Sequence, residues 1–191
     1  MCQRLVLALG IALAACSPAL DWRESRQSEL AFTVSLPGKP LVAAREIAFE
    51  GAVLPMTMVS AGRDGTLFAV GVARLPPAAV ADPAAVQQTT GRFAESLRRN
   101  VHGIESPTGS PLAVPTFAGG FAAGRTLRSD VAFSARGGAA SGGKSRAVHL
   151  YARLVVADDR LYQVVALGSA EQLTAQALET FFQSFRLLPL S

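Results

Sequence analysis

One segment near the C-terminus constrains the fold more than any other. Residues 147–156 alternate apolar and polar side chains, Asp158 and Asp159 follow, and residues 161–167 resume the apolar pattern. Alternation with a period of two is typical of a half-buried β-strand, and two such runs around a short polar turn predict a β-hairpin. A hairpin pairs its strands antiparallel, which argues against a doubly wound parallel sheet.

Earlier segments carry the same kind of pattern. Gly62-Arg63-Asp64-Gly65 separates two apolar runs and predicts a second hairpin. A proline-rich stretch, Pro37-Gly38-Lys39-Pro40, ends the first strand, and Pro76-Pro77 closes this region. The expected strands before the C-terminal hairpin are residues 31–36, 47–50, 54–61, 66–74 and a strand within 121–133.

Two segments have helical spacing instead. Asp82 is a suitable N-cap, Pro83 suits the first helical position, and a polar end follows at His102-Gly103. In the second helix, Ser169 and Gln172 have the spacing of a capping box. The apolar faces are expected from Val86, Thr90, Phe93, Leu97 and Val101 in the first helix, and from Leu173, Ala177, Leu178, Phe181, Phe182 and Phe185 in the second.

The order of elements is therefore strands, helix, strands, helix. It predicts an α+β fold with an antiparallel sheet of about six strands and helices packed on it. Of the 191 residues, 50% are hydrophobic and 17% charged, a composition that excludes intrinsic disorder. The length suits one domain, expected over residues 30–191.

The N-terminus indicates export. Arg4 is followed by an unbroken apolar run over residues 5–15. A helix of that length rises about 17 Å, well short of the ~30 Å hydrocarbon core of a bilayer. A basic start, a short apolar stretch and small residues at its end are typical of a signal peptide, here residues 1–15.

The end of this run, Leu13-Ala14-Ala15-Cys16, resembles the bacterial lipobox. The resemblance implies signal cleavage between Ala15 and Cys16 and transfer of a diacylglycerol to the Cys16 thiol. Residues 16–29 are then a lipidated N-terminus and tether to a domain that faces the periplasm. Ser17 in place of an aspartate favours sorting to the outer membrane. Trp22 lies at the membrane interface or clips the tether onto the domain, and we favour the clip.

Processing would also remove the free thiols. Cys2 leaves with the signal peptide and Cys16 becomes a thioether, so neither a disulfide nor cysteine catalysis is expected. The formal charge of +4 falls to +3 when Arg4 is removed. Basic residues are scattered over many segments, and the densest pair, Arg98-Arg99, is read as a solvated helix face, so no nucleic-acid partner is expected.

The domain resembles the PsbP-like fold, which includes the DcrB-like bacterial lipoproteins. The resemblance rests on the opening Phe32-Thr33-Val34-Ser35-Leu36-Pro37, the paired strands, the long middle helix, and the closing run from Phe181 to Leu187. Relatives often place an aromatic residue where this chain has Gly38-Lys39-Pro40. The resemblance implies an α+β sandwich that docks to partners and transfers no catalytic residues.

Residues 138–145, Gly-Ala-Ala-Ser-Gly-Gly-Lys-Ser, match the phosphate-loop pattern. That chemistry needs a helix after the loop, whereas the following residues alternate like a strand. We therefore interpret residues 136–145 as a flexible connection and expect no nucleotide. Neither His102 nor His149 has another histidine at ligand spacing, and the surroundings of Ser141 lack the first glycine of a nucleophile elbow, so we expect no metal, cofactor or catalytic residue.

Two hypotheses remain. The first is a non-enzymatic, lipid-anchored cell-envelope lipoprotein with an accessory or protein-binding role. The alternative is a small-molecule-binding or hydrolytic periplasmic domain that uses a cleft between sheet and helices, with convergent polar groups around His149, Tyr151, Arg153 and Tyr162.

Overall fold

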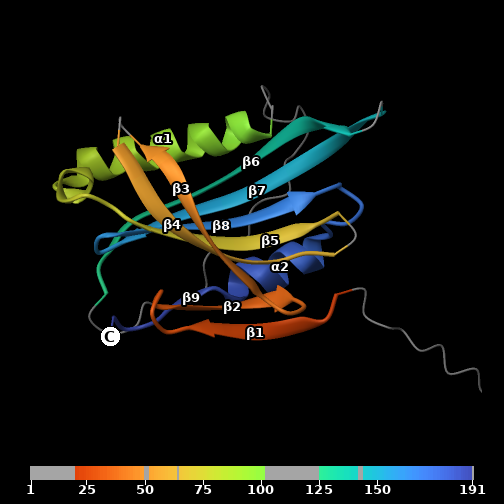
Figure 1. The fold of residues 1–191 in the computed structure, drawn as a ribbon, viewed down its shortest axis with the longest axis horizontal. Helices are drawn as coiled ribbons and strands as arrows, with labels where there is room; N and C mark the ends of the chain where they lie inside the picture. The colour runs from red at the N-terminus through yellow and green to blue at the C-terminus, as the bar shows by residue number, and fades with distance from the viewer. Residues whose placement is uncertain (1–19, 50–51, 64, 102–124, 142–143, 191) are drawn as a thin grey trace, which may run out of the picture.

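A computed structural model describes residues 20–49, 52–63, 65–101, 125–141 and 144–190 (Figure 1). The fold is α+β, with two sheets and two α-helices. In chain order the elements are β1 (Trp22–Gln27), β2 (Phe32–Pro37), β3 (Leu41–Phe49), β4 (Ala52–Ala61), β5 (Leu67–Arg74), a 3-10 turn (Pro77–Val80), α1 (Pro83–Asn100), β6 (Leu127–Ser141), β7 (Lys144–Ala157), β8 (Arg160–Gly168), α2 (Ala175–Ser184) and β9 (Arg186–Leu187).

The larger sheet has six antiparallel strands in the order β3-β4-β5-β8-β7-β6. This confirms the predicted antiparallel sheet and both predicted hairpins, β4–β5 and β7–β8. The central pair, β5 and β8, joins distant parts of the sequence and runs in register from Leu67↔Leu167 to Arg74↔Arg160. In a smaller sheet, β1-β2-β9, the central strand β2 pairs with the first described strand on one side and the last on the other.

The large sheet separates two layers (Figure 1). On one face lies α1, whose buried Val86, Phe93 and Ala94 pack with Leu154 and Leu161 of the sheet. On the other face, α2 and the small sheet enclose the larger core, which includes all of the following: Phe32, Val34, Phe68, Tyr162, Val164, Phe181, Phe182 and Phe185. Alternate residues of the central strands thus supply both cores, which explains why the strands are so apolar.

Both helices begin at side-chain caps. Asp82 accepts a hydrogen bond from the Ala85 N–H at 2.8 Å, as the sequence predicts for α1. The start of α2 differs from the prediction, because Thr174, not Ser169, caps it through the Ala177 N–H. The Ser169 hydroxyl does contact Gln172 Oε1 at 2.9 Å, but in the turn before the helix, so the capping-box residues meet without starting it.

The folded domain begins before the predicted boundary at residue 30. Residues 22–27, which the sequence analysis assigned to the tether, form β1 and pair with β2 from Trp22↔Pro37 to Gln27↔Phe32. The alternation in this stretch is hidden by charged side chains, because β1 is an edge strand with one exposed face. Leu20 and Trp22 pack against the larger core, and the Trp22 ring lies edge-on to Phe68 at 5.4 Å. The predicted clip by Trp22 is therefore correct.

Two other strands were underestimated. The strand predicted over residues 47–50 is β3, which begins at Leu41. The predicted flexible connection over residues 136–145 is wrong where the structure describes it, because β6 continues to Ser141 and β7 begins at Lys144. Pairing along the register from Arg136↔His149 to Ser141↔Lys144 satisfies the backbone of a glycine-rich segment with low intrinsic strand propensity.

Candidate functional site

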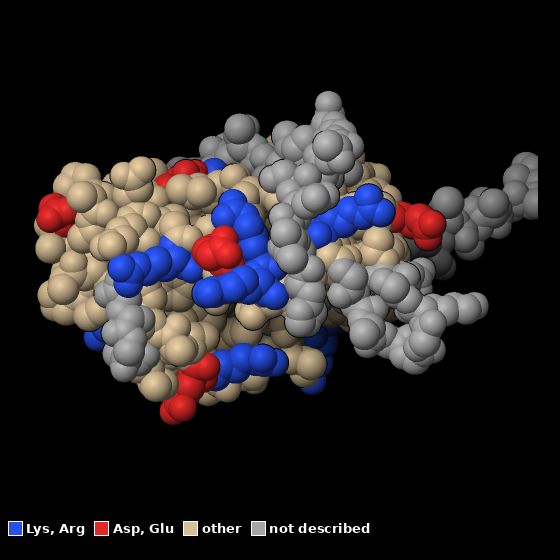
Figure 2. Space-filling view, turned by 90° about the horizontal axis from the view of Figure 1, so that it is seen from above, with Lys and Arg blue, Asp and Glu red and all other residues tan. Residues whose placement is uncertain are grey.

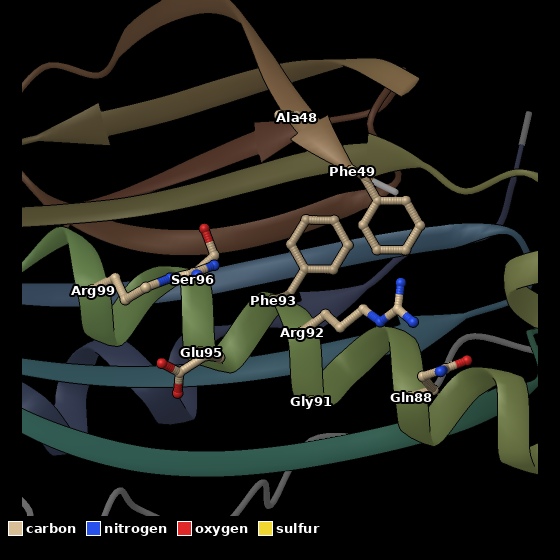
Figure 3. Close-up of a pocket in the computed structure, with 9 residues that line it drawn as sticks. All are labelled: Ala48, Phe49, Gln88, Gly91, Arg92, Phe93, Glu95, Ser96 and Arg99. Carbon is tan, nitrogen blue, oxygen red and sulfur yellow. The ribbon is translucent and has the colours of Figure 1, made fainter. Parts of the chain in front are cut away.

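The larger of two grooves beside α1 lies between this helix and the tip of β3 (Figure 3). Its volume is about 500 Å³. Every third or fourth residue of the helix faces it, because these positions share one side of an α-helix. The lining residues are Ala48 and Phe49 from β3 and Gln88, Gly91, Arg92, Phe93, Glu95, Ser96 and Arg99 from α1.

Two aromatic rings form the apolar part of this groove. Phe49 and Phe93 are both buried, and their rings stack with centroids 4.9 Å apart and an interplanar angle of 9°. Figure 3 shows the rings side by side, with the β3 tip brought against the helix. Stacking therefore fixes the β3 tip against α1 and sets the width of the groove.

The rim of the groove is charged. Figure 2, which views the α1 side of the molecule, shows basic side chains gathered around an acidic one near the middle of this face. Along the helix, Glu95 lies between Arg92 and Arg99. Its carboxylate pairs with Arg98 at 3.9 Å, and the Arg98 guanidinium also lies 4.5 Å from the ring centroid of Phe133 in β6. Arg98 thus pairs with Glu95, the acidic residue among the described residues that line the groove.

This arrangement suits an anionic ligand with an apolar part. Arg92 and Arg99 are seven residues apart, so their stems are separated by about 10 Å along the helix axis. Three residues of an extended peptide cover the same length. The guanidinium group binds carboxylates through paired hydrogen bonds, and the Phe49–Phe93 stack supplies an apolar surface in the same groove.

A smaller groove of about 290 Å³ lies on the opposite side of α1, against β6. Gly91 faces both grooves, and Thr90 reaches the Ser129 hydroxyl at 3.3 Å across the second one. Arg128 donates to the Val80 carbonyl at 2.9 Å, which ties β6 to the 3-10 turn. These contacts explain how α1 is fixed on the sheet.

The four polar residues proposed for a cleft share one face of the sheet, the α2 face. The two grooves described above contain none of them. Tyr162 donates to the Leu30 carbonyl at 3.1 Å, and the buried Arg153 forms an ion pair with the partly exposed Asp130. Burial, and secondarily the nearby Arg136, lower the pKa of His149; burial also raises the pKa of Tyr151.

A buried arginine cluster lies at the far end of the same face, and sequence reasoning missed it. The Arg125 guanidinium bonds Asp158 at 2.5 Å, the Leu188 carbonyl at 2.9 Å and the Tyr162 hydroxyl at 2.9 Å. Asp158 has a positive φ of 54° and closes the β7–β8 turn. The cluster therefore ties this turn to the C-terminal segment, and its many partners indicate a structural role.

The positions of the other sites predicted from the sequence are as follows. Cys16, Ala15 and His102 lie outside the described residues, as do residues 142–143 of the phosphate-loop pattern. The rest of that pattern belongs to β6 and β7, where a strand follows the loop. Within the described ranges, the structure brings no three His, Cys, Asp or Glu side chains to a common metal site, and no helix there has the length and apolarity to cross a bilayer.

No protein-family model matches this chain. No curated protein matches it either.

The groove was not predicted from the sequence, although its parts carried a signal. Gln88, Arg92, Glu95 and Arg99 form a polar stripe at helical spacing next to the apolar stripe that was recognised. The sequence did not predict that Phe49 lies beside these residues, since only the fold brings the tip of β3 to the helix.

Proposed function

We propose that this chain is a non-enzymatic, lipid-anchored lipoprotein of the cell envelope whose domain binds an acidic segment of an envelope protein. The lipid is carried by Cys16, and the domain faces the periplasm, with Ser17 favouring the outer membrane. The resemblance to PsbP-like and DcrB-like proteins supports a docking role.

The observation that carries the binding role is the groove between α1 and β3. Arg92 and Arg99 border an apolar floor made by Phe49 and Phe93. Its two cations at a spacing of about 10 Å suit two acidic side chains of an extended peptide.

Site-specific photocrosslinking in the native envelope tests this proposal. A photoreactive amino acid at Gln88 faces the groove, whereas the same group at the neighbouring Gln87 faces the smaller groove and serves as the matched control. We expect a discrete crosslinked protein from position 88 only. The double substitution Arg92→Ser and Arg99→Ser should abolish that product, while Arg98→Ser should leave it.

Absence of a product from position 88, or a product that persists without both arginines, would contradict binding in this groove. The groove volume of about 500 Å³ also lies in the range of small-molecule sites, which favours a small organic anion as the second candidate. Native mass spectrometry after mild detergent extraction separates the two, because a small ligand adds a fixed mass that the arginine substitutions remove.

A further inference from the structure

One end of the domain lies close to the predicted lipid anchor. Leu20 and Trp22 pack on the larger core, so the chain is fixed to the domain from Leu20 onward. Leu20 follows Cys16 by four residue-to-residue steps, with three residues between them. Even fully extended, these four steps reach about 14 Å. If Cys16 carries the lipid, this end of the domain must stay near the bilayer surface.

Strand register shows which residues share that end. Trp22 pairs with Pro37 at the end of β2, and its ring touches Phe68 at the start of β5. Phe68 pairs with Ala61, and the preceding Ser60 pairs with Leu41. The start of β1, the β2–β3 connection and the β4–β5 turn therefore meet here, at the right of Figure 1.

Apolar side chains are exposed at this end. Leu41 and Val42 at the start of β3 are 69% and 60% exposed, and Leu67 at the start of β5 is 36% exposed. Leu41 and Val42 point to opposite faces of the sheet because neighbouring residues of a strand alternate. Neither α1 nor α2 therefore covers both, and together they form an apolar edge.

The charges at this end largely cancel. Lys39 and Arg63 are exposed, and Glu171, which precedes the Gln172 side chain that lies beside Gly65, is exposed as well. Asp21 pairs with Arg23 at 2.5 Å. The surface thus combines the apolar edge with a polar rim whose charges largely cancel. Such a surface suits the interface of a phospholipid bilayer more than a strongly charged partner.

We propose that this end, formed by Leu41, Val42 and Leu67, docks on the phospholipid bilayer that holds the anchor. The inference rests on the proposed lipidation of Cys16 and deepens it. The acyl chains hold the domain near the membrane, and the apolar tips then orient it by entering the headgroup region. In this orientation β5 runs away from the bilayer, and its antiparallel partner β8 runs toward it.

Lipid-quenching measurements on the acylated full chain test the docking. The mature protein has no other free thiol, so a fluorophore is placed on Lys39→Cys and, as the control, on Leu127→Cys, which pairs with Ala157 at the opposite end of the sheet. The proteins are reconstituted in vesicles of phosphatidylethanolamine and phosphatidylglycerol, 3:1, with brominated lipids as quenchers.

We expect quenching of the label at position 39 and little at position 127. Leu41→Ser with Val42→Ser should lower the ratio of docked to undocked protein by at least about tenfold, since each buried side chain of this size contributes a factor of that order. Leu127→Ser is the matched control for this double substitution. Unchanged quenching in vesicles of phosphatidylcholine would fit the balanced charge, whereas loss of quenching there would overturn docking by the apolar tips.

Mass spectrometry of the N-terminal peptide separates the two proposals. An unmodified Cys16 would overturn the lipid anchor. An acylated Cys16 with equal or absent quenching at positions 39 and 127 would overturn docking alone, and would leave the apolar edge to a protein partner. Equal urea midpoints for the labelled variants ensure that the comparison concerns folded protein.

Discussion

Two ion pairs of equal length provide a direct test of how burial controls stability in this fold. Arg125–Asp158 and Arg23–Asp21 both have N–O distances of 2.5 Å. The side chains of the first pair are 1% and 23% exposed, and those of the second are 61% and 60% exposed. Substitution of each aspartate by alanine removes the same type of contact from two very different surroundings.

The decrease in the free energy of unfolding expected for Asp158→Ala follows from the contacts that Arg125 keeps and loses. The Arg125 guanidinium keeps its bonds to the Leu188 carbonyl and the Tyr162 hydroxyl but loses its counter-charge while it is still buried. Removal of one partner from a buried pair typically costs about 3–5 kcal/mol. The Thr126 N–H also loses its acceptor, Asp158 Oδ1 at 3.0 Å. We therefore expect a loss of about 4 kcal/mol in the free energy of unfolding.

Asp158→Asn separates the effect of the negative charge from that of the hydrogen bond, because it removes only the charge. Asparagine tolerates the positive φ at this position and retains an acceptor for Thr126, so we expect about half the loss, ~2 kcal/mol. Asp21→Ala should leave stability unchanged within error, because exposed pairs compete with water and salt.

Urea unfolding of the full chain in one detergent measures these changes, with Trp22 as the only tryptophan. Emission from Trp22 reports its contact with Phe68, so the transition follows the packing of β1 on the core. The reasoning would be refuted if Asp158→Ala and Asp21→Ala shifted the unfolding free energy equally, or if Asp158→Asn were as costly as the alanine variant.

Three further predictions concern single side chains. Gly91→Ala should stabilise α1 by about 0.5–1 kcal/mol, since an added Cβ meets no atom within 4 Å, and a raised urea midpoint checks it. Gly62→Ala should instead lower that midpoint strongly, because its Cβ would lie 2.2 Å from the Thr66 carbonyl oxygen; an unchanged midpoint would refute the turn geometry. The pKa of His149 is lowered in the folded state by burial and Arg136, so the unfolded chain binds more protons near the ordinary histidine pKa and stability should fall as the pH drops below about 6.5. His149→Gln should remove this part of the pH dependence of the urea midpoint between pH 7.5 and 5.

The sequence predicted those elements whose signal is local. The Asp82 cap and the apolar stripe define α1, and the alternation around Asp158-Asp159 defines the β7–β8 hairpin. It failed where a strand depends on its partner. β1 carries charges on its exposed face, and the glycine-rich ends of β6 and β7 have little intrinsic preference for a strand. Pairing with a neighbour, which no local pattern encodes, decides these segments.

The same limit explains why the groove was not found in advance. The stripe on α1 was visible, but a surface becomes a groove only when a second wall faces it, and here that wall is Phe49 at the tip of β3. The buried Arg125 cluster shows the same dependence, since it joins segments near residues 30, 125, 158 and 188. Long-range packing, rather than residue type, creates both sites.

The geometry of β3 also separates the two proposed surfaces. Leu41 and Phe49 are its ends, and eight residues of extended chain span about 27 Å. If the Leu41 end docks on the bilayer, the Phe49 end and its groove are held away from the membrane, where the periplasmic part of an envelope protein can reach Arg92 and Arg99. The two sites are then independent, because no described side chain belongs to both. Leu41→Ser with Val42→Ser should accordingly leave crosslinking from position 88 intact. If the double substitution abolished both bilayer docking and crosslinking from position 88, the result would instead indicate that bilayer docking orients the groove toward its partner.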